Sequence, residues 1–314
     1  MRGERTLQHW AMFTFLVVMY GGAFAGTKLT VQSIPPLVTV AARASLAAAF
    51  LYAVLRFSGE TLPPVRQKTE NGARFNPIWA HFIRLGFFGV VLPFGTMSVG
   101  VQYIDSALAG ILTAIVPIAT LVMAHFFSPG ERISVEGVTG FALSFIGLCI
   151  LMGPSALSEV GGNTFVYQLM VLVGAVSYAG NTVLIRRGPP TPFLTLTTGA
   201  FVGASLFMVP LALALHPPGS YGPSVGSVVA LVALAFGPTA LAGLTVFRLI
   251  QLAGASFAAA SNYFVPVVAI IVGAIAYGER MPKSTLVALA VILGGVAISQ
   301  MRFKELGARL SGGR

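Results

Sequence analysis

The amino-acid sequence predicts an all-α integral membrane protein whose ten transmembrane helices form a five-plus-five inverted repeat. Three observations lead to this fold class. Hydrophobic residues make up 56% and charged residues 9% of the 314 residues, which leaves too little polar surface to coat a soluble globular protein. Apolar stretches of transmembrane length recur along the whole chain. A set of short motifs from the first half returns in the same order in the second half.

The apolar stretches define the ten spans. A helix needs about 20 mostly apolar residues to cross the hydrocarbon core of a bilayer. The spans lie at roughly 10–28, 36–57, 80–104, 106–127, 134–153, 164–184, 193–215, 226–251, 256–277 and 284–301. The run 111–127 shows none of the alternation of polar and apolar residues that marks a membrane β-strand. Helices are therefore predicted throughout.

The first span imitates a secretory signal peptide, because basic residues precede it and Ala23-Phe24-Ala25 looks like a cleavage site. We expect it to be retained as a helix. The dipeptides Ala25-Gly26 and Pro35-Pro36 return as Ala179-Gly180 and Pro189-Pro190, at a constant offset of 154 residues. The first span therefore has a structural counterpart in the sixth.

Proline and glycine residues inside later spans predict places where the helices bend. Pro117 lies within the fourth span and Pro266 within the ninth, and a proline inside a helix removes a backbone hydrogen bond and kinks the helix. Gly22 and Gly26 of the first span are further hinge candidates. The alternative for the glycines is that they permit close packing of neighbouring helices.

Three motifs carry the internal repeat. The first half has Gln102–Ser106, Val116-Pro117 and Gly130-Glu131-Arg132, and the second half has Gln251–Ala255, Val265-Pro266 and Gly278-Glu279-Arg280. The offset is 149 residues at the glutamine and the proline and 148 at Gly-Glu-Arg. We expect one repeat over 1–153 and the other over 154–314, the second ending in a short tail. Because each repeat has an odd number of spans, the two insert upside down, as in many secondary transporters.

The basic residues predict how the chain is oriented. Thirteen Lys and Arg residues fall in loops on one side, whereas Lys28, Arg280 and Lys283 fall on the other. The positive-inside rule then places both termini in the cytoplasm of a multi-pass protein of the cell (inner) membrane. Because these residues are scattered over several loops, we expect no nucleic-acid partner despite the net charge of +10.

The chain resembles the EamA-type members of the drug/metabolite transporter superfamily. Tyr20 to Phe24 with Lys28, Pro35-Pro36 and Arg43 is similar to the opening of the family module, and the three repeated motifs with Gly147 and Gly295 are similar to its end. The second copy departs from the opening pattern, with Asn181-Thr182 where Thr27-Lys28 stand and Thr197 opposite Arg43. This asymmetry suits a duplicated scaffold that binds an asymmetric solute.

The resemblance implies an exporter of small metabolites, typically amino acids or related compounds, with aromatic amino acid exporters as a candidate subgroup. It also implies a central cavity lined mainly by helices one, three, four, six, eight and nine. We expect alternating access, a small-molecule solute and the lipid bilayer as partners, no cofactor, and a monomer or weak homodimer.

The ionisable residues within the spans constrain the solute. Arg43 lies in the second span and Arg248 near the inner end of the eighth, whereas all nine acidic residues lie in loops or at helix ends. Antiport of cationic drugs by a carboxylate needs such a group inside the membrane. We therefore expect a solute with a carboxylate or a dipolar head, moved by uniport. A proton-coupled drug, metabolite or nucleotide-sugar antiporter is the alternative.

The candidate solute-binding residues are identified by their depth in the membrane and by the polarity of their side chains. They are Tyr20, Phe24, Arg43, Thr96, Tyr178, Asn181, Asn262 and Tyr263. Aromatic rings suit stacking on an aromatic solute, and amides and hydroxyls suit a zwitterion. The competing role for the polar residues is hydrogen bonding between neighbouring helices.

An enzyme is not expected. His9, His81, His125 and His216 lie far apart without the spacing of metal ligands, and no two acidic residues lie together in a span. A lipid-modifying membrane enzyme would need such groups clustered at one interface. His81 and Arg84 come nearest to this, but a lone pair of this kind is more often an interfacial anchor. We therefore predict no catalytic residue and no metal site.

Overall fold

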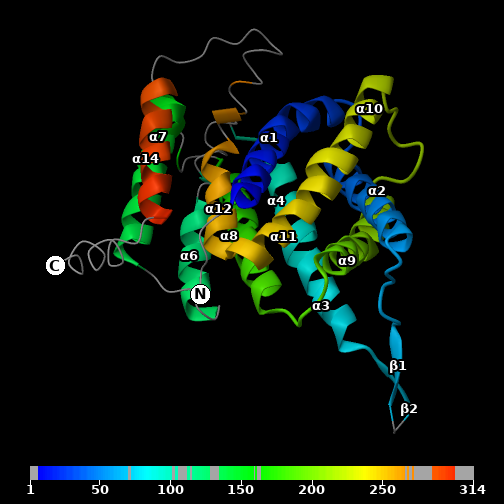
Figure 1. The fold of residues 1–314 in the computed structure, drawn as a ribbon. Helices are drawn as coiled ribbons and strands as arrows, with labels where there is room; N and C mark the ends of the chain where they lie inside the picture. Colours follow the sequence, from blue (N-terminus) through cyan, green and yellow to red (C-terminus); the bar gives the residue numbers. More distant parts are fainter. Residues whose placement is uncertain are drawn as a thin grey trace, which may run out of the picture.

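The computed structural model describes residues 6–69, 72–100, 103–104, 112–113, 115–127, 134–158, 160, 164–265, 267–268, 271 and 285–300. These residues form a helical bundle with one small hairpin (Figure 1). The helices are α1 (Leu7–Thr30), α2 (Pro36–Phe57), α3 (Pro77–Gly86), α4 (Leu92–Gly100), α6 (Ile115–Phe127), α7 (Val135–Ser158), α8 (Phe165–Arg187), α9 (Phe193–Leu215), α10 (Val225–Leu234), α11 (Ala242–Ala253), α12 (Ala255–Ala260) and α14 (Thr285–Gln300).

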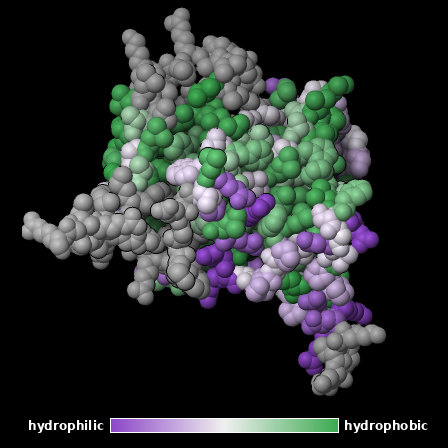
Figure 2. All heavy atoms as spheres, in the orientation of Figure 1, coloured by the Kyte–Doolittle hydropathy of each residue, from purple (hydrophilic) through white to green (hydrophobic). Residues whose placement is uncertain are grey.

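The all-α membrane fold predicted from the sequence is confirmed. Each of the ten predicted spans contains at least one described helix. Within the described residues, five continuous helical segments are long and apolar enough to cross a bilayer, and they are Pro36–Phe57, Pro77–Gly100, Phe165–Arg187, Phe193–Leu215 and Val225–Ala253. Large hydrophobic side chains such as Phe126 and Val229 are exposed on the outside. Figure 2 shows a largely hydrophobic surface over the helices, with hydrophilic residues concentrated toward the lower end of the view.

Helix packing reflects the duplication. Helices α2 and α9, from the second and seventh spans, pack together, and α7 and α14, from the fifth and tenth spans, pack together at the other side of the bundle (Figure 1). Likewise α4 packs against α8, and α10 and α11 pack against α1. Exchanging the two halves maps each of these contacts onto an equivalent contact, as a five-plus-five repeat requires.

The third and eighth spans each contain a wider helical turn. The π-helix η1 (Phe87–Val91) lies between α3 and α4, and the π-helix η3 (Ala235–Leu241) lies between α10 and α11. Shifting η1 by the repeat offset of 149 residues places it inside η3. Single π turns within α-helices are rare and occur frequently at functional sites. Both spans carry glycine and proline at this point, including Gly89 and Pro238.

The ninth span also departs from a regular α-helix. Helix α12 gives way to the 3-10 turn η4 (Ser261–Tyr263). Gly254, with φ of 91°, forms the whole connection between α11 and α12 and holds a left-handed conformation that only glycine adopts without strain. Pro266 and both Gly-Glu-Arg motifs lie outside the described residues.

A β-hairpin projects from the bundle between the second and third spans (Figure 1). Strands β1 (Arg66–Thr69) and β2 (Gly72–Phe75) pair in antiparallel register. The base of the hairpin is attached to α3, because Trp79 Nε1 donates to the Pro63 carbonyl at 3.0 Å and Asn76 Nδ2 donates to the Pro64 carbonyl at 3.2 Å. The sequence reading did not predict this element.

Candidate functional site

Arg43, in the second span, lies at the centre of a group of side chains from four other spans. It is 8% exposed, and it extends from α2 toward η3, where its Nε donates to Thr239 Oγ1 at 3.0 Å. The Thr239 hydroxyl in turn donates to the Leu234 carbonyl at 2.7 Å, five residues earlier in the chain. The π turn thus directs a hydroxyl oxygen at the guanidinium of Arg43.

Aromatic residues complete this group. The Arg43 guanidinium carbon lies 5.0 Å from the centroid of the Phe94 ring in α4, within cation–π range. The Phe94 ring makes an edge contact with Tyr178 of α8, with centroids 6.2 Å apart. Tyr20 of α1 and Tyr178 are both close enough to interact electrostatically with Arg43. We call Tyr20, Arg43, Phe94, Tyr178 and Thr239 the Arg43 cluster.

The charge of Arg43 has no counter-ion within the described part of the chain. Its partners are a hydroxyl and an aromatic ring. Glu60 and Glu136 are the acidic residues that the structure describes, and both lie at helix ends, with Glu60 accepting a hydrogen bond from Thr195. A guanidinium has five N–H donors, and Nε provides the one donor that bonds to a described residue. The terminal Nη groups bond to no described residue, and such groups bind a carboxylate through two parallel hydrogen bonds.

Asn181 lies one turn after Tyr178 on α8 and packs against η1. It is 8% exposed, and its Oδ1 has no hydrogen-bond partner. A methyl group added at Gly89 would come within 2.5 Å of Asn181 Nδ2, so the amide needs a glycine at this π turn. Ser177, one turn earlier, donates to the Phe88 carbonyl of η1 at 2.7 Å. Asn181 Oδ1 is thus a buried acceptor without a partner, one turn along α8 from Tyr178 of the Arg43 cluster.

The other predicted binding residues lie in different surroundings. Thr96 donates to the Leu92 carbonyl at 2.8 Å and packs against Gly174 of α8. Tyr263 is fully buried, and its hydroxyl donates to the Phe141 carbonyl of α7 at 3.1 Å. Asn262 donates to the Ala259 carbonyl one turn earlier at 2.9 Å. These hydrogen bonds are local or interhelical, and none joins the Arg43 cluster.

The hinge candidates occupy varied positions. Helix α1 runs without interruption through Gly22 and Gly26. Gly26 packs against Leu234 of α10, where an added Cβ would lie 2.9 Å from Leu234 Cδ2, whereas the space beside Gly22 is open. Pro117 is buried near the start of α6. Phe24 follows Tyr20 by one turn in α1, and its side chain lies outside the described part of the structure.

Sequence reasoning missed Phe94 and Thr239. A signal was present, because the repeat offset pairs Phe94 with Gly243 and Thr239 with Val90. Phe94 and Thr239 have side chains suited to contact Arg43, whereas their counterparts Gly243 and Val90 do not. Positions where the two copies differ were therefore the candidates for side chains that contact Arg43.

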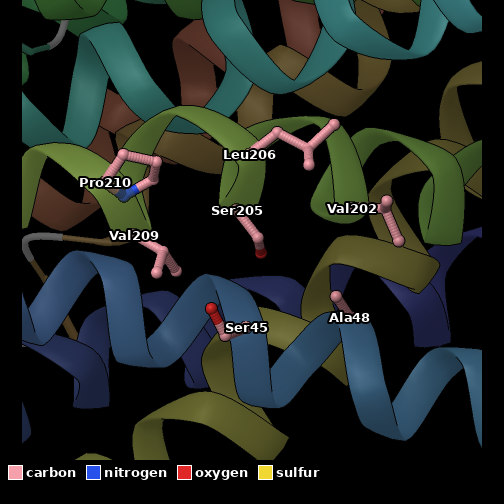
Figure 3. Close-up of a pocket in the computed structure, with 7 residues that line it drawn as sticks. All are labelled: Ser45, Ala48, Val202, Ser205, Leu206, Val209 and Pro210. Carbon is pink, nitrogen blue, oxygen red and sulfur yellow. The ribbon is translucent and has the colours of Figure 1, made fainter.

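A separate groove lies between α2 and α9 (Figure 3). It has a volume of about 390 Å³ and is lined mainly by apolar side chains, with Ser45 and Ser205 among them. Leu206 and Val209 at its edge are 59% and 36% exposed. The groove therefore belongs to the apolar outer surface, and none of its lining residues is in the Arg43 cluster. The described residues contain no group of three or more potential metal-ligating side chains.

Comparison with known proteins identifies the type of chain. The model of the EamA-like transporter family matches residues 9–153 and 166–301. An uncharacterized transporter of Archaeoglobus fulgidus is 24% identical over 93% of this chain and 98% of its own length. The uncharacterized inner membrane transporter YedA of Escherichia coli is 27% identical over 95% of this chain and 92% of its own length. A protein of known crystal structure shares the fold, with a TM-score of 0.77, 21% identity, and coverage of 95% and 99% of the two chains.

Proposed function

Because this chain belongs to the EamA-like transporter family, we propose that it exports small metabolites that carry a carboxylate, foremost amino acids and related compounds. The observation that carries the proposal is Arg43, a buried cation whose partners among the described residues are neutral. Removing an ion from water costs several kcal/mol unless a counter-ion or a set of hydrogen bonds replaces the lost hydration. A solute carboxylate would supply both.

The surroundings of Arg43 favour an amino acid over a simple carboxylate. The unpaired Oδ1 of Asn181 is an acceptor suited to a solute ammonium group. The phenol hydroxyls of Tyr20 and Tyr178 make no hydrogen bond to a described residue, so both hydroxyls are available to the solute. The rings of Phe94 and Tyr178 offer edges and faces to an aromatic side chain. We therefore include aromatic amino acids among the proposed solutes.

The proposed mechanism is alternating access by uniport. The Arg43 cluster is built from the first, second, third, sixth and eighth spans, so it contains residues of both halves of the repeat. Rocking one half against the other would expose such a cluster to each side of the membrane in turn. The two π turns and the prolines are the proposed points of bending. Among the described spans the one acidic side chain is Glu136, in the first turn of α7, and the lack of a deeper carboxylate there supports transport without a carboxylate that carries protons.

The orientation follows from the charge bias. The excess of Lys and Arg on one side supports cytoplasmic termini. In this orientation the hairpin and the connection from α8 to α9 face the cytoplasm, and export carries solute away from them.

The test is transport by the purified full-length protein in proteoliposomes. Labelled amino acids, their decarboxylated amines and quaternary-ammonium cations are compared, with and without an imposed pH gradient. We expect flux of one or more amino acids, no flux of the matching amines, and no dependence on the gradient. Flux of the cations that disappears when the gradient is dissipated would refute both the solute class and the uniport mechanism.

A further inference from the structure

A second polar site lies between the first turns of α3 and the last turns of α8. The pocket has a volume of about 530 Å³. Its lining includes Asn76, His81 and Arg84 from the α3 side and Arg187 and Gly188 from the α8 side. None of the lining residues belongs to the Arg43 cluster, and the proposed transport mechanism uses none of them.

The charged side chains that line this pocket are both positive. Arg84 and Arg187 contribute two guanidinium groups, and no acidic side chain lines the pocket. Arg84 Nε donates to the Ala80 carbonyl at 3.1 Å, which leaves its terminal Nη groups for another partner. Neither arginine forms an ion pair within the described part of the chain. Two unpaired cations facing one cavity favour an anion there.

His81 supplies an unsatisfied polar atom at the wall of the same pocket. It is 7% exposed, and its Nε2 has no hydrogen-bond partner. The imidazole lies directly against Gly188, where an added Cβ would overlap Nε2. Arg84 is close enough to His81 to interact with it electrostatically. Nε2 is enclosed against Gly188, so the His81 ring closes one wall of the pocket and leaves the pairing with a ligand to the two arginines.

The start of α3 adds to the positive potential. Asn76 caps this helix by accepting a hydrogen bond from the Ile78 amide at 3.2 Å, and Pro77 occupies the first helical position. The helix continues through η1 into α4, so the positive end of its dipole lies beside the pocket.

We propose that this pocket binds a phosphate group, and that the headgroup of an anionic phospholipid is its source in the membrane. Arginine pairs with phosphate through parallel hydrogen bonds, and two such residues provide donors for several phosphate oxygens. Ile78 and Leu184 also line the pocket. These apolar side chains would contact the glycerol and upper acyl region of a lipid, whereas free phosphate would leave them uncovered. The charge bias assigns this end of the helices to the cytoplasmic leaflet, and basic pockets between helices on that side suit anionic headgroups.

The experiment measures ligand retention by the purified full-length protein. Native mass spectrometry is performed after titration with phosphatidylglycerol, with phosphatidylcholine, and with inorganic phosphate in separate arms. We expect one phosphatidylglycerol per chain to be held preferentially, with phosphatidylcholine bound at least about tenfold more weakly. Arg84→Gln and Arg187→Gln should each weaken phosphatidylglycerol binding about tenfold or more, the expected effect of losing a charge-assisted hydrogen bond.

Arg56→Gln is the matched control. Arg56 is an exposed residue in the last turn of α2 and does not line the pocket, yet its substitution removes the same charge from the same end of the bundle. Thermal unfolding and size-exclusion profiles establish that Arg84→Gln, Arg187→Gln and Arg56→Gln are each folded. His81→Gln is a further variant, which keeps a neutral polar side chain at the wall of the pocket.

Three outcomes decide the proposal. Retention of phosphatidylglycerol that falls in the pocket variants and not in Arg56→Gln supports the site with a lipid as its source. Equally tight, Arg84-dependent retention of inorganic phosphate supports the phosphate site and assigns it to a soluble ligand. Absence of preferential retention in both arms, or an equal loss in Arg56→Gln, overturns the proposal.

Discussion

Arg43 Nε donates to Thr239 Oγ1 at 3.0 Å, and this bond joins the second span to the π turn of the eighth across 196 residues of chain. It connects the two halves of the repeat through a charged group.

Thr239→Val should lower transport without unfolding the protein. The substitution preserves shape and removes the hydroxyl oxygen that accepts from Arg43. A hydrogen bond to a charged group contributes about 1.5–3 kcal/mol, so we expect kcat/KM to fall about tenfold or more. Thr245→Val is the control, because Thr245 lies in the same span and its hydroxyl donates to the Leu241 carbonyl at 2.8 Å. Equal losses in the two variants would mean that the Thr239 hydroxyl has no special role.

Arg43→Gln and Arg43→Lys separate the charge from the geometry of the guanidinium. Losing one member of a buried charged pair weakens binding by about 2–5 kcal/mol, so the Gln variant should lose about 100-fold or more in kcat/KM. The Lys variant retains the charge without the planar fork and should fall between the Gln variant and the wild type. Transport assays with one labelled amino acid measure both. Arg248→Gln, which removes an exposed cation stacked on Phe193, should transport normally.

Gly89→Ala should destabilise the protein, whereas Gly95→Ala should not. A methyl group at Gly89 would overlap the Asn181 amide, and the space beside Gly95 is open. Overpacking typically costs about 1–3 kcal/mol, and alanine in an exposed helix is favoured over glycine by up to about 1 kcal/mol. The midpoint of thermal unfolding in detergent measures both effects. If the two variants unfold at the same temperature, Asn181 does not depend on the π turn in the way described.

Tyr263→Phe should affect stability more than transport. The Tyr263 hydroxyl donates to the Phe141 carbonyl of α7, and loss of such a bond removes about 1 kcal/mol. We expect a lower thermal midpoint with KM unchanged, and the same unchanged KM for Asn262→Ala. A raised KM at normal stability in either variant would instead place that residue among the solute-binding groups, as the sequence suggested.

The bundle was predictable because lipid imposes a simple rule on the chain. Every span must be apolar over about 20 residues, and the repeated motifs confirmed the count in each half. Arg43 stood out for the same reason, since a charged residue inside a span is costly and is rarely present without a role. Tyr20 and Tyr178 were found from their depth in the first and sixth spans.

The contacts of Arg43 were harder to predict. Thr239 lies in the π-helix η3, where it meets Arg43, and the glycine and proline of this segment indicated a bend without indicating which side chain would face Arg43. Tyr263 illustrates the reverse problem. Its depth in the ninth span suggested the central cavity, but depth does not reveal which neighbour a side chain faces, and its hydroxyl contacts α7. The hairpin carried only a weak local signal, because Asn71-Gly72 is a dipeptide typical of tight turns but Gly72 pairs with Thr69 as the first residue of β2.

The paired π turns bear on the history of this chain. A π turn arises when an α-helix accommodates one additional residue without losing its continuity. Such a turn lies at equivalent positions of the third and eighth spans. A single insertion before the gene duplicated accounts for both turns. Later insertions would have had to occur independently at the equivalent position of each half. A widened helix in the half-length ancestor is the simplest origin of both turns, whereas Arg43 and Thr239, which meet across the halves, each stand in one copy only, with Thr197 and Val90 at the equivalent positions of the other.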